Sequence, residues 1–202
     1  TKAIHLKDYA PPAFRVETVE LDFDIREDHA LVTAKLEMIR SGQGPLVLDG
    51  EELELVSVSV NGAPARHEVT AETLTVHEVP DAFTLETVTR IVPQQNTKLE
   101  GLYATKNGFV TQCEAQGFRR ITWFIDRPDV MARYTTTIHA EREKFPVLLS
   151  NGNPVAQGDE SPTTSALTAP SPAGASPPLQ GGEKKSVRHW IKWQDPFPKP
   201  CY

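Results

Sequence analysis

The segment from Thr111 to Asp129 carries the highest density of side chains capable of chemistry in this sequence. It places an amide, a thiol and a carboxylate in succession at Gln112, Cys113 and Glu114, and two arginines and three large aromatic residues follow. Pro128 predicts a turn at its end, because proline fixes its own φ and keeps the preceding residue out of the helical region. Either these groups form hydrogen bonds with one another in a purely structural cluster, or some of them face a cleft.

Composition excludes two classes of partner. The chain has 202 residues and a formal net charge of −6, and it contains no block of lysine and arginine, so we expect no nucleic-acid partner. No run of about 18 apolar residues is present, so we expect no membrane span. The length suits one large all-β domain with a sizeable core.

Cys113 and Cys201 do not form a disulfide framework, and free thiols are typical of a reducing compartment. We therefore expect the protein to be cytoplasmic, or to lie in the stroma of an organelle if a transit peptide has been removed. Cys113 has no nearby histidine in the sequence, which favours a small buried residue over a nucleophile.

Apolar and polar residues alternate along much of the N-terminal half, as in strands with one wet face. Val19 to Ile25 and Val32 to Met38 show this pattern clearly, and Asn61-Gly62 signals a two-residue hairpin. Shorter strands are expected at 46–48, 53–60, 66–69, 73–77 and 83–91. Turns recur about every ten residues, which predicts a sandwich or a related all-β architecture.

The C-terminal part should add a Thr-rich strand at Tyr134 to Ala140 and a short one at Pro146 to Leu149. Asn151-Gly152 then signals a hairpin whose return strand is Val187 to Trp193. Residues 154–182 have six prolines and only two charged residues, and we interpret them as an insertion loop. A proline-rich ligand for a partner protein is the alternative for this segment.

Two histidines begin an H-E pair, but neither completes a metal motif. A zinc-peptidase helix needs a second histidine four residues on, and after His67 and His77 those positions hold Ala71 and Asp81. We therefore expect no metal site and no catalytic residue in this chain, and solvent-facing strand histidines instead.

The central run TQCEAQGFRRITWFIDRPDVM resembles a signature of the aminopeptidase N family of zinc metallopeptidases (gluzincin clan), of the bacterial type that also occurs in plants and algae. Further segments agree with that family in order: Leu6–Tyr9, Pro45–Gly50, Leu99–Tyr103, Pro146–Asn153 and His189–Phe197.

The resemblance implies that residues 1–202 form the single N-terminal domain, a saddle-shaped β-sandwich of antiparallel strands. A short irregular or helical turn is expected near 115–125. The catalytic zinc domain, with its own H-E-x-x-H motif, is absent from this sequence, and we expect the polypeptide to continue beyond Tyr202.

The resemblance also implies two substrate-binding residues. Glu114 matches the glutamate that this domain contributes to the active site, where it contacts the α-ammonium of the substrate. Gln112 would line the pocket for the first substrate side chain. A surface strand carboxylate is the alternative for Glu114. Arg119, Arg120 and Asp126 are interpreted as structural, with Trp123 and Phe124 as packing residues.

On this reading the parent protein is an enzyme that removes N-terminal amino acids from peptides, with zinc held by residues outside this chain. The isolated domain should be inactive and bind no metal. Its partners would be its own catalytic domain and peptides with a free N-terminus. The alternative is a free-standing β-sandwich module that binds a protein or a carbohydrate without catalysis.

Overall fold

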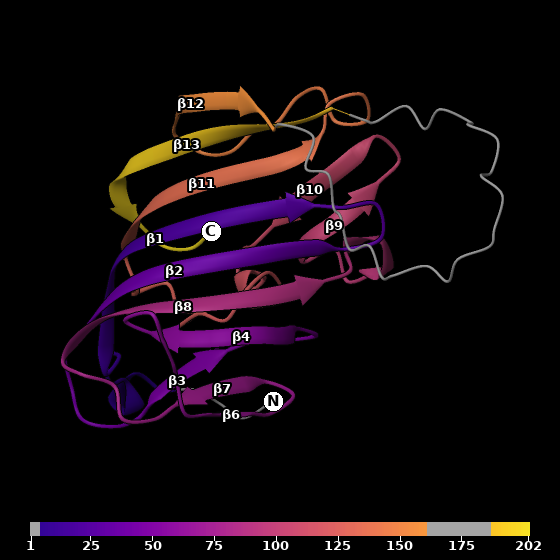
Figure 1. Ribbon diagram of the computed structural model, residues 1–202. Helices are drawn as coiled ribbons and strands as arrows, with labels where there is room; N and C mark the ends of the chain where they lie inside the picture. The colour runs from indigo at the N-terminus through magenta and orange to yellow at the C-terminus, as the bar shows by residue number, and fades with distance from the viewer. Residues whose placement is uncertain (1–4, 161–186) are drawn as a thin grey trace, which may run out of the picture.

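The computed structural model describes residues 5–160 and 187–202, and this part of the chain is almost entirely β-structure (Figure 1). The expected all-β fold is therefore confirmed. The strands are β1 (Phe14–Ile25), β2 (Ala30–Arg40), β3 (Leu46–Asp49), β4 (Glu54–Val60), β5 (Ala63–Pro64), β6 (His67–Val69), β7 (Thr73–Val76), β8 (Ala82–Ile91), β9 (Gly101–Thr105), β10 (Gly108–Gln112), β11 (Ala132–Glu141), β12 (Asn153–Asp159) and β13 (Arg188–Lys199). Three short 3-10 helices join them: η1 (Leu6–Asp8), η2 (Pro93–Gln95) and η3 (Phe118–Arg120). None of these described helices has the length and apolar character needed to cross a membrane.

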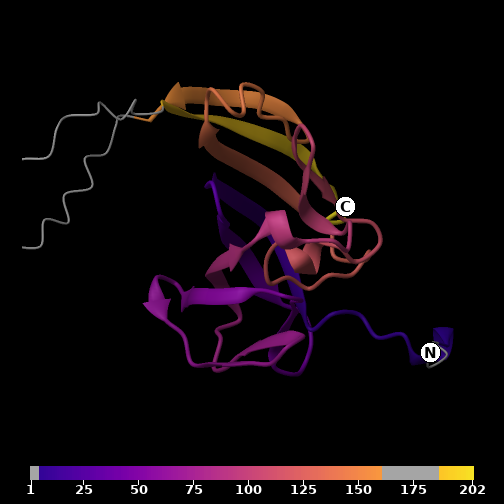
Figure 2. The same cartoon turned by 90° about the vertical axis from the view of Figure 1, so that its right-hand side faces the viewer.

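An eight-stranded sheet dominates the fold, in the order β12-β13-β11-β1-β2-β8-β4-β5. A three-stranded sheet, β3-β7-β6, and the β9–β10 hairpin complete the described part (Figures 1 and 2). Every pairing is antiparallel as expected, except that β1 and β11 run parallel. A parallel pair requires a long crossover, and here most of the domain lies between the two strands.

Strand periodicity places the core on one face of the large sheet. Successive side chains of a strand point to opposite faces, and β1 and β2 bury alternate residues along nearly their whole length. The small sheet contributes further buried residues, and Trp123 and Phe124 are 1% and 0% exposed, which agrees with their interpretation as packing residues. The buried apolar residues of β1, β2, β3 and β7 are Phe14, Val16, Val19, Leu21, Phe23, Ile25, Ala30, Val32, Ala34, Leu36, Met38, Leu46, Leu48, Leu74 and Val76.

Three predictions near the C-terminus are wrong in detail. Pro146 to Leu149 form no strand, and the return strand β13 continues to Lys199 instead of ending at Trp193. The insertion was expected from residue 154, yet residues 154–159 belong to β12. Since β12 is an edge strand with mostly exposed side chains, it has no apolar alternation to reveal it. The remainder of the predicted insertion, 161–182, lies outside the described residues.

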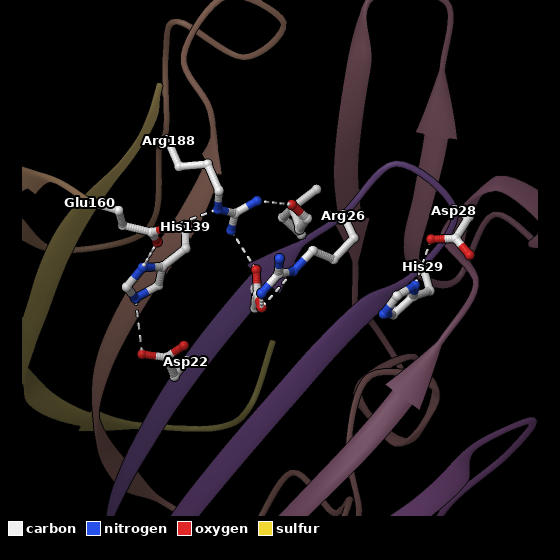
Figure 3. A network of polar contacts seen from close by, with 9 residues as sticks. Asp22, Arg26, Asp28, His29, His139, Glu160 and Arg188 are labelled. Carbon is white, nitrogen blue, oxygen red and sulfur yellow. Dashed lines mark hydrogen bonds and ion pairs between the residues drawn. The ribbon is translucent and has the colours of Figure 1, made fainter. Parts of the chain in front are cut away.

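A polar network on the outer face fastens the β12–β13 hairpin to β1 (Figure 3). His139 lies between two carboxylates, with Nδ1 2.6 Å from Glu160 Oε1 and Nε2 3.2 Å from Asp22 Oδ2. Arg188 donates to Glu160 at 2.8 Å and also to Asp24. The hydrogen bond to Asp22 raises the pKa of His139. Partial burial lowers that pKa by a smaller amount, and the bond to Glu160 raises it further.

Candidate functional site

A tight turn between β10 and η3 carries the residues singled out by sequence. The backbone amide of Gly117 donates to the carbonyl of Cys113 at 2.9 Å, which closes residues 113–117 into one turn. A β-carbon on Gly117 would lie 2.3 Å from the Gln112 carbonyl oxygen, so only glycine fits there. Residues 118–120 then form η3, and the expected irregular or helical turn near 115–125 is confirmed.

Glu114 lies in this turn with its side chain exposed to solvent. No residue of the described ranges forms a hydrogen bond or an ion pair with its carboxylate. Gln112 is also exposed, and its Nε2 donates to the backbone carbonyl of Glu114 at 3.1 Å. Gln112, the last residue of β10, therefore braces the turn, while its Oε1 stays available as an acceptor.

An open groove of about 880 Å³ begins at this turn. Its floor is the inner face of β1 and β11, including Phe23 and Tyr134, and one wall comes from β10 with Gln112, Cys113 and Glu114. Residues 144–151 and 199–202 complete the lining. The structure thus brings both predicted site residues together at the rim of one groove.

Below the turn, a buried ion pair anchors η3. Arg119 Nε donates to Asp126 Oδ2 at 2.8 Å, and the Arg119 backbone amide approaches the same oxygen at 3.3 Å. Asp126 is 1% exposed, and its own amide donates to Asp49 Oδ2 at 3.1 Å. The next residue, Arg120, is surrounded by three carboxylates, with which it forms ion pairs: Glu51, Glu52 and Glu100. These contacts agree with a structural role for both arginines and for Asp126.

The two thiols of the chain are free cysteines beside the groove, and neither is poised as a nucleophile. Burial, with a smaller contribution from the charge of Asp126, raises the pKa of Cys113 to about 12. Cys201 is buried, and its thiol donates to Asp126 Oδ1 at 3.1 Å. Because the thiolate is the reactive form, Cys113 acts as a small packing residue at neutral pH.

Residues 5–160 and 187–202 contain no group of three or more histidine, cysteine, aspartate or glutamate side chains that could hold a metal ion. His67 is exposed on β6, and His77 lies just after β7 and faces Glu68 at 3.4 Å. The donor set in this part of the chain does not fit a zinc ion.

Sequence reasoning missed two residues that line the groove, Tyr134 and Cys201. Tyr134 is buried in its floor, and its hydroxyl has no hydrogen-bond partner among the described residues. Cys201 reaches the groove from the C-terminal segment. The sequence shows Tyr134 only as a strand residue and Cys201 only as a residue near the end of the chain. Long-range packing, which local pattern does not reveal, places both in the same groove as Glu114.

The fold and the groove define a class: an all-β domain that presents an exposed carboxylate at the rim of an open groove. The sequence matches the Peptidase M1 N-terminal domain over residues 18–168, and the chain belongs to that family.

Relatives and solved structures agree with this assignment. The whole chain aligns with aminopeptidase N of Escherichia coli at 43% identity over 204 residues, and with that of Caulobacter vibrioides at 46% over 206 residues. It spans 21% of each of those proteins, about a fifth of their length. A crystal structure of Legionella pneumophila aminopeptidase A in complex with aspartic acid superposes with a TM-score of 0.79, at 31% identity over 98% of this chain and 21% of that one. An M1 zinc metallopeptidase from Deinococcus radiodurans shares the fold, with a TM-score of 0.67 at 16% identity over 94% of this chain and 41% of that one.

Proposed function

We propose that this chain is the N-terminal domain of a zinc aminopeptidase that removes N-terminal amino acids from peptides. In this proposal the domain packs on the catalytic domain and supplies Glu114, which contacts the substrate α-ammonium. The observation that carries the proposal is the exposure of Glu114 and the lack of a partner for its carboxylate among the described residues. Glu114 lies at the groove rim in this state, whereas Arg119 and Arg120 each form ion pairs with carboxylates.

The chemistry suits an exopeptidase. A peptide α-amino group has a pKa near 8 and is largely protonated at neutral pH. A carboxylate that accepts a hydrogen bond from it contributes about 1.5–3 kcal/mol. Gln112 lies two residues away with a free Oε1, and it would line the pocket for the first substrate side chain.

Apolar side chains beside the groove support packing against another domain. Val147 and Leu149 are 68% and 71% exposed, and Val110 of β10 is 42% exposed. An apolar patch of this kind marks an interaction surface. We assign it to the catalytic domain, which would also hold the zinc, since the described residues of this chain offer no ligand set.

The same uncovered apolar residues could serve a free-standing interaction module, which is the second candidate. The coding sequence after Tyr202 distinguishes the two: an H-E-x-x-H motif downstream supports the peptidase, and a stop codon supports the module.

The biochemical test compares the full-length protein with the 202-residue chain. We expect aminopeptidase activity only in the full-length protein, and Glu114→Ala there should raise KM and lower kcat/KM for peptides with a free N-terminus. Normal cleavage by that variant would contradict the role proposed for Glu114.

A further inference from the structure

Asp126, whose carboxylate is buried, joins three parts of the chain through its side chain and its backbone. Oδ2 accepts from the side chain of Arg119 at 2.8 Å, and Oδ1 accepts from the thiol of Cys201 at 3.1 Å. The backbone of Asp126 is also engaged: its carbonyl accepts from Arg119 at 3.2 Å, and its amide donates to Asp49 at 3.1 Å. Asp126 is therefore bonded to η3, to the end of β3 and to the C-terminal segment.

A short and stiff path leads from this carboxylate to Glu114. Arg119 lies in η3, and the hydrogen bond from the Arg120 amide to the Gly117 carbonyl, at 3.1 Å, ties η3 to the turn. The bond from Gly117 to Cys113 then closes the turn around Glu114. Gly117 also packs closely against Gln112, the last residue of β10, so the turn is confined on its other side as well.

The other end of the path is fixed to the body of the domain. Asp49 and Phe124 exchange two backbone hydrogen bonds, at 2.7 and 3.1 Å, so the segment preceding Asp126 is paired with β3. Cys201, 8% exposed, brings residues 199–202 against the same carboxylate. The place of Glu114 is thereby defined relative to both the sandwich and the C-terminal segment.

A buried ion pair is a poor source of stability, because desolvation offsets most of the Coulombic attraction. Apolar side chains of similar volume would stabilise the core equally well. We therefore attribute to this ion pair the role of fixing the geometry of the segments that it joins. We propose that Asp126 is a positioning residue that holds Glu114 at a fixed place for the substrate ammonium. This inference rests on the proposed function, and it adds a residue that acts only through Glu114.

A double-mutant cycle in the full-length enzyme tests this coupling, with kcat and KM measured on peptides with a free N-terminus. Asp126→Asn keeps the shape and removes the charge that holds Arg119. We expect kcat/KM to fall about ten- to a hundredfold, mainly through KM, as for other displaced binding groups. In the Glu114→Ala background the same change should alter kcat/KM by less than about twofold. Asp129→Asn is the matched control. Asp129 lies three residues after Asp126, and its replacement removes only an exposed ion pair with Arg127, so kcat/KM should stay unchanged.

The second variant leaves the ion pair in place, in case Asp126→Asn does not fold. Cys201→Ala removes only the thiol donor and should raise KM, and Cys201→Ser, which restores a donor, should recover it. Equal losses from Asp126→Asn with and without Glu114 would overturn the positioning role, as would a normal KM in both Asp126→Asn and Cys201→Ala. If Glu114→Ala itself has no effect, the proposed function fails first, and the positioning role fails with it.

Discussion

Replacing Gly117 by alanine probes the turn that carries Glu114. The added β-carbon would lie 2.3 Å from the Gln112 carbonyl oxygen, 3.0 Å from Cys113 Cα and 3.0 Å from the Gly101 amide nitrogen. All three are backbone atoms, so no side-chain rotation relieves the clash. Gly117 has φ −81°, which alanine adopts freely, and the effect is therefore steric.

We expect Gly117→Ala to lower the free energy of unfolding by about 1–3 kcal/mol, the usual cost of overpacking. Alanine restricts the unfolded chain and recovers about 0.4–1 kcal/mol of that loss. Urea unfolding followed by tryptophan fluorescence measures the difference, since Trp123 is buried in the core.

The matched control is Gly42→Ala, where the nearest atom to the new β-carbon is Ala13 Cα at 3.3 Å. A small shift relieves that contact, and we expect a change within about 0.5 kcal/mol. If Gly117→Ala proves as stable as Gly42→Ala, the turn is not sterically fixed, and the rigid path from η3 to Glu114 is wrong.

Three further measurements test other parts of the structure. The pKa of His139 is raised above its ordinary 6.5 by the bonds to Asp22 and Glu160, so its contribution to stability is complete below that value and is lost as the pH rises through the folded-state pKa. Unfolding free energies from about pH 6 to 9 should therefore decline, and His139→Gln should flatten that decline; an unchanged slope would contradict the network. Burial raises the pKa of Cys113 to about 12, so alkylation of the native chain at pH 8 should be far slower at Cys113 than after unfolding, as read by mass spectrometry. Phe124 is fully buried, so Phe124→Ala should lower the free energy of unfolding by about 3–5 kcal/mol. A melting temperature equal to that of the parent protein would refute its place in the core.

Much of the fold follows from local pattern. The alternation in β1 and β2 predicts strands because one face of each is buried, and in the structure alternate residues of both strands are buried almost without a break. The parallel pairing of β1 with β11 could not be predicted in this way, because it depends on a crossover and not on a hairpin. β12 escaped notice because its exposed side chains carry no periodic signal.

The site was predictable in its residues and not in its surroundings. Resemblance to a family singled out Glu114 and Gln112, and the structure places both at a groove rim. The bond from Gln112 to the Glu114 carbonyl and the bond from Cys201 to Asp126 were not foreseen. Both depend on side-chain geometry that spacing along the chain does not encode, and the second joins residues 75 positions apart.

The central claim is that the charge of Glu114 recognises a free amino terminus. Its most direct test measures kcat/KM of the full-length protein for a peptide and for its N-acetylated form, in the parent sequence and in Glu114→Gln. Glu20→Gln, which changes an exposed glutamate on the outer face of β1, is the control. We predict that Glu114→Gln lowers kcat/KM for the free peptide by about 10- to 150-fold, corresponding to about 1.5–3 kcal/mol, and narrows the preference over the acetylated form. An unchanged preference in Glu114→Gln would contradict the claim.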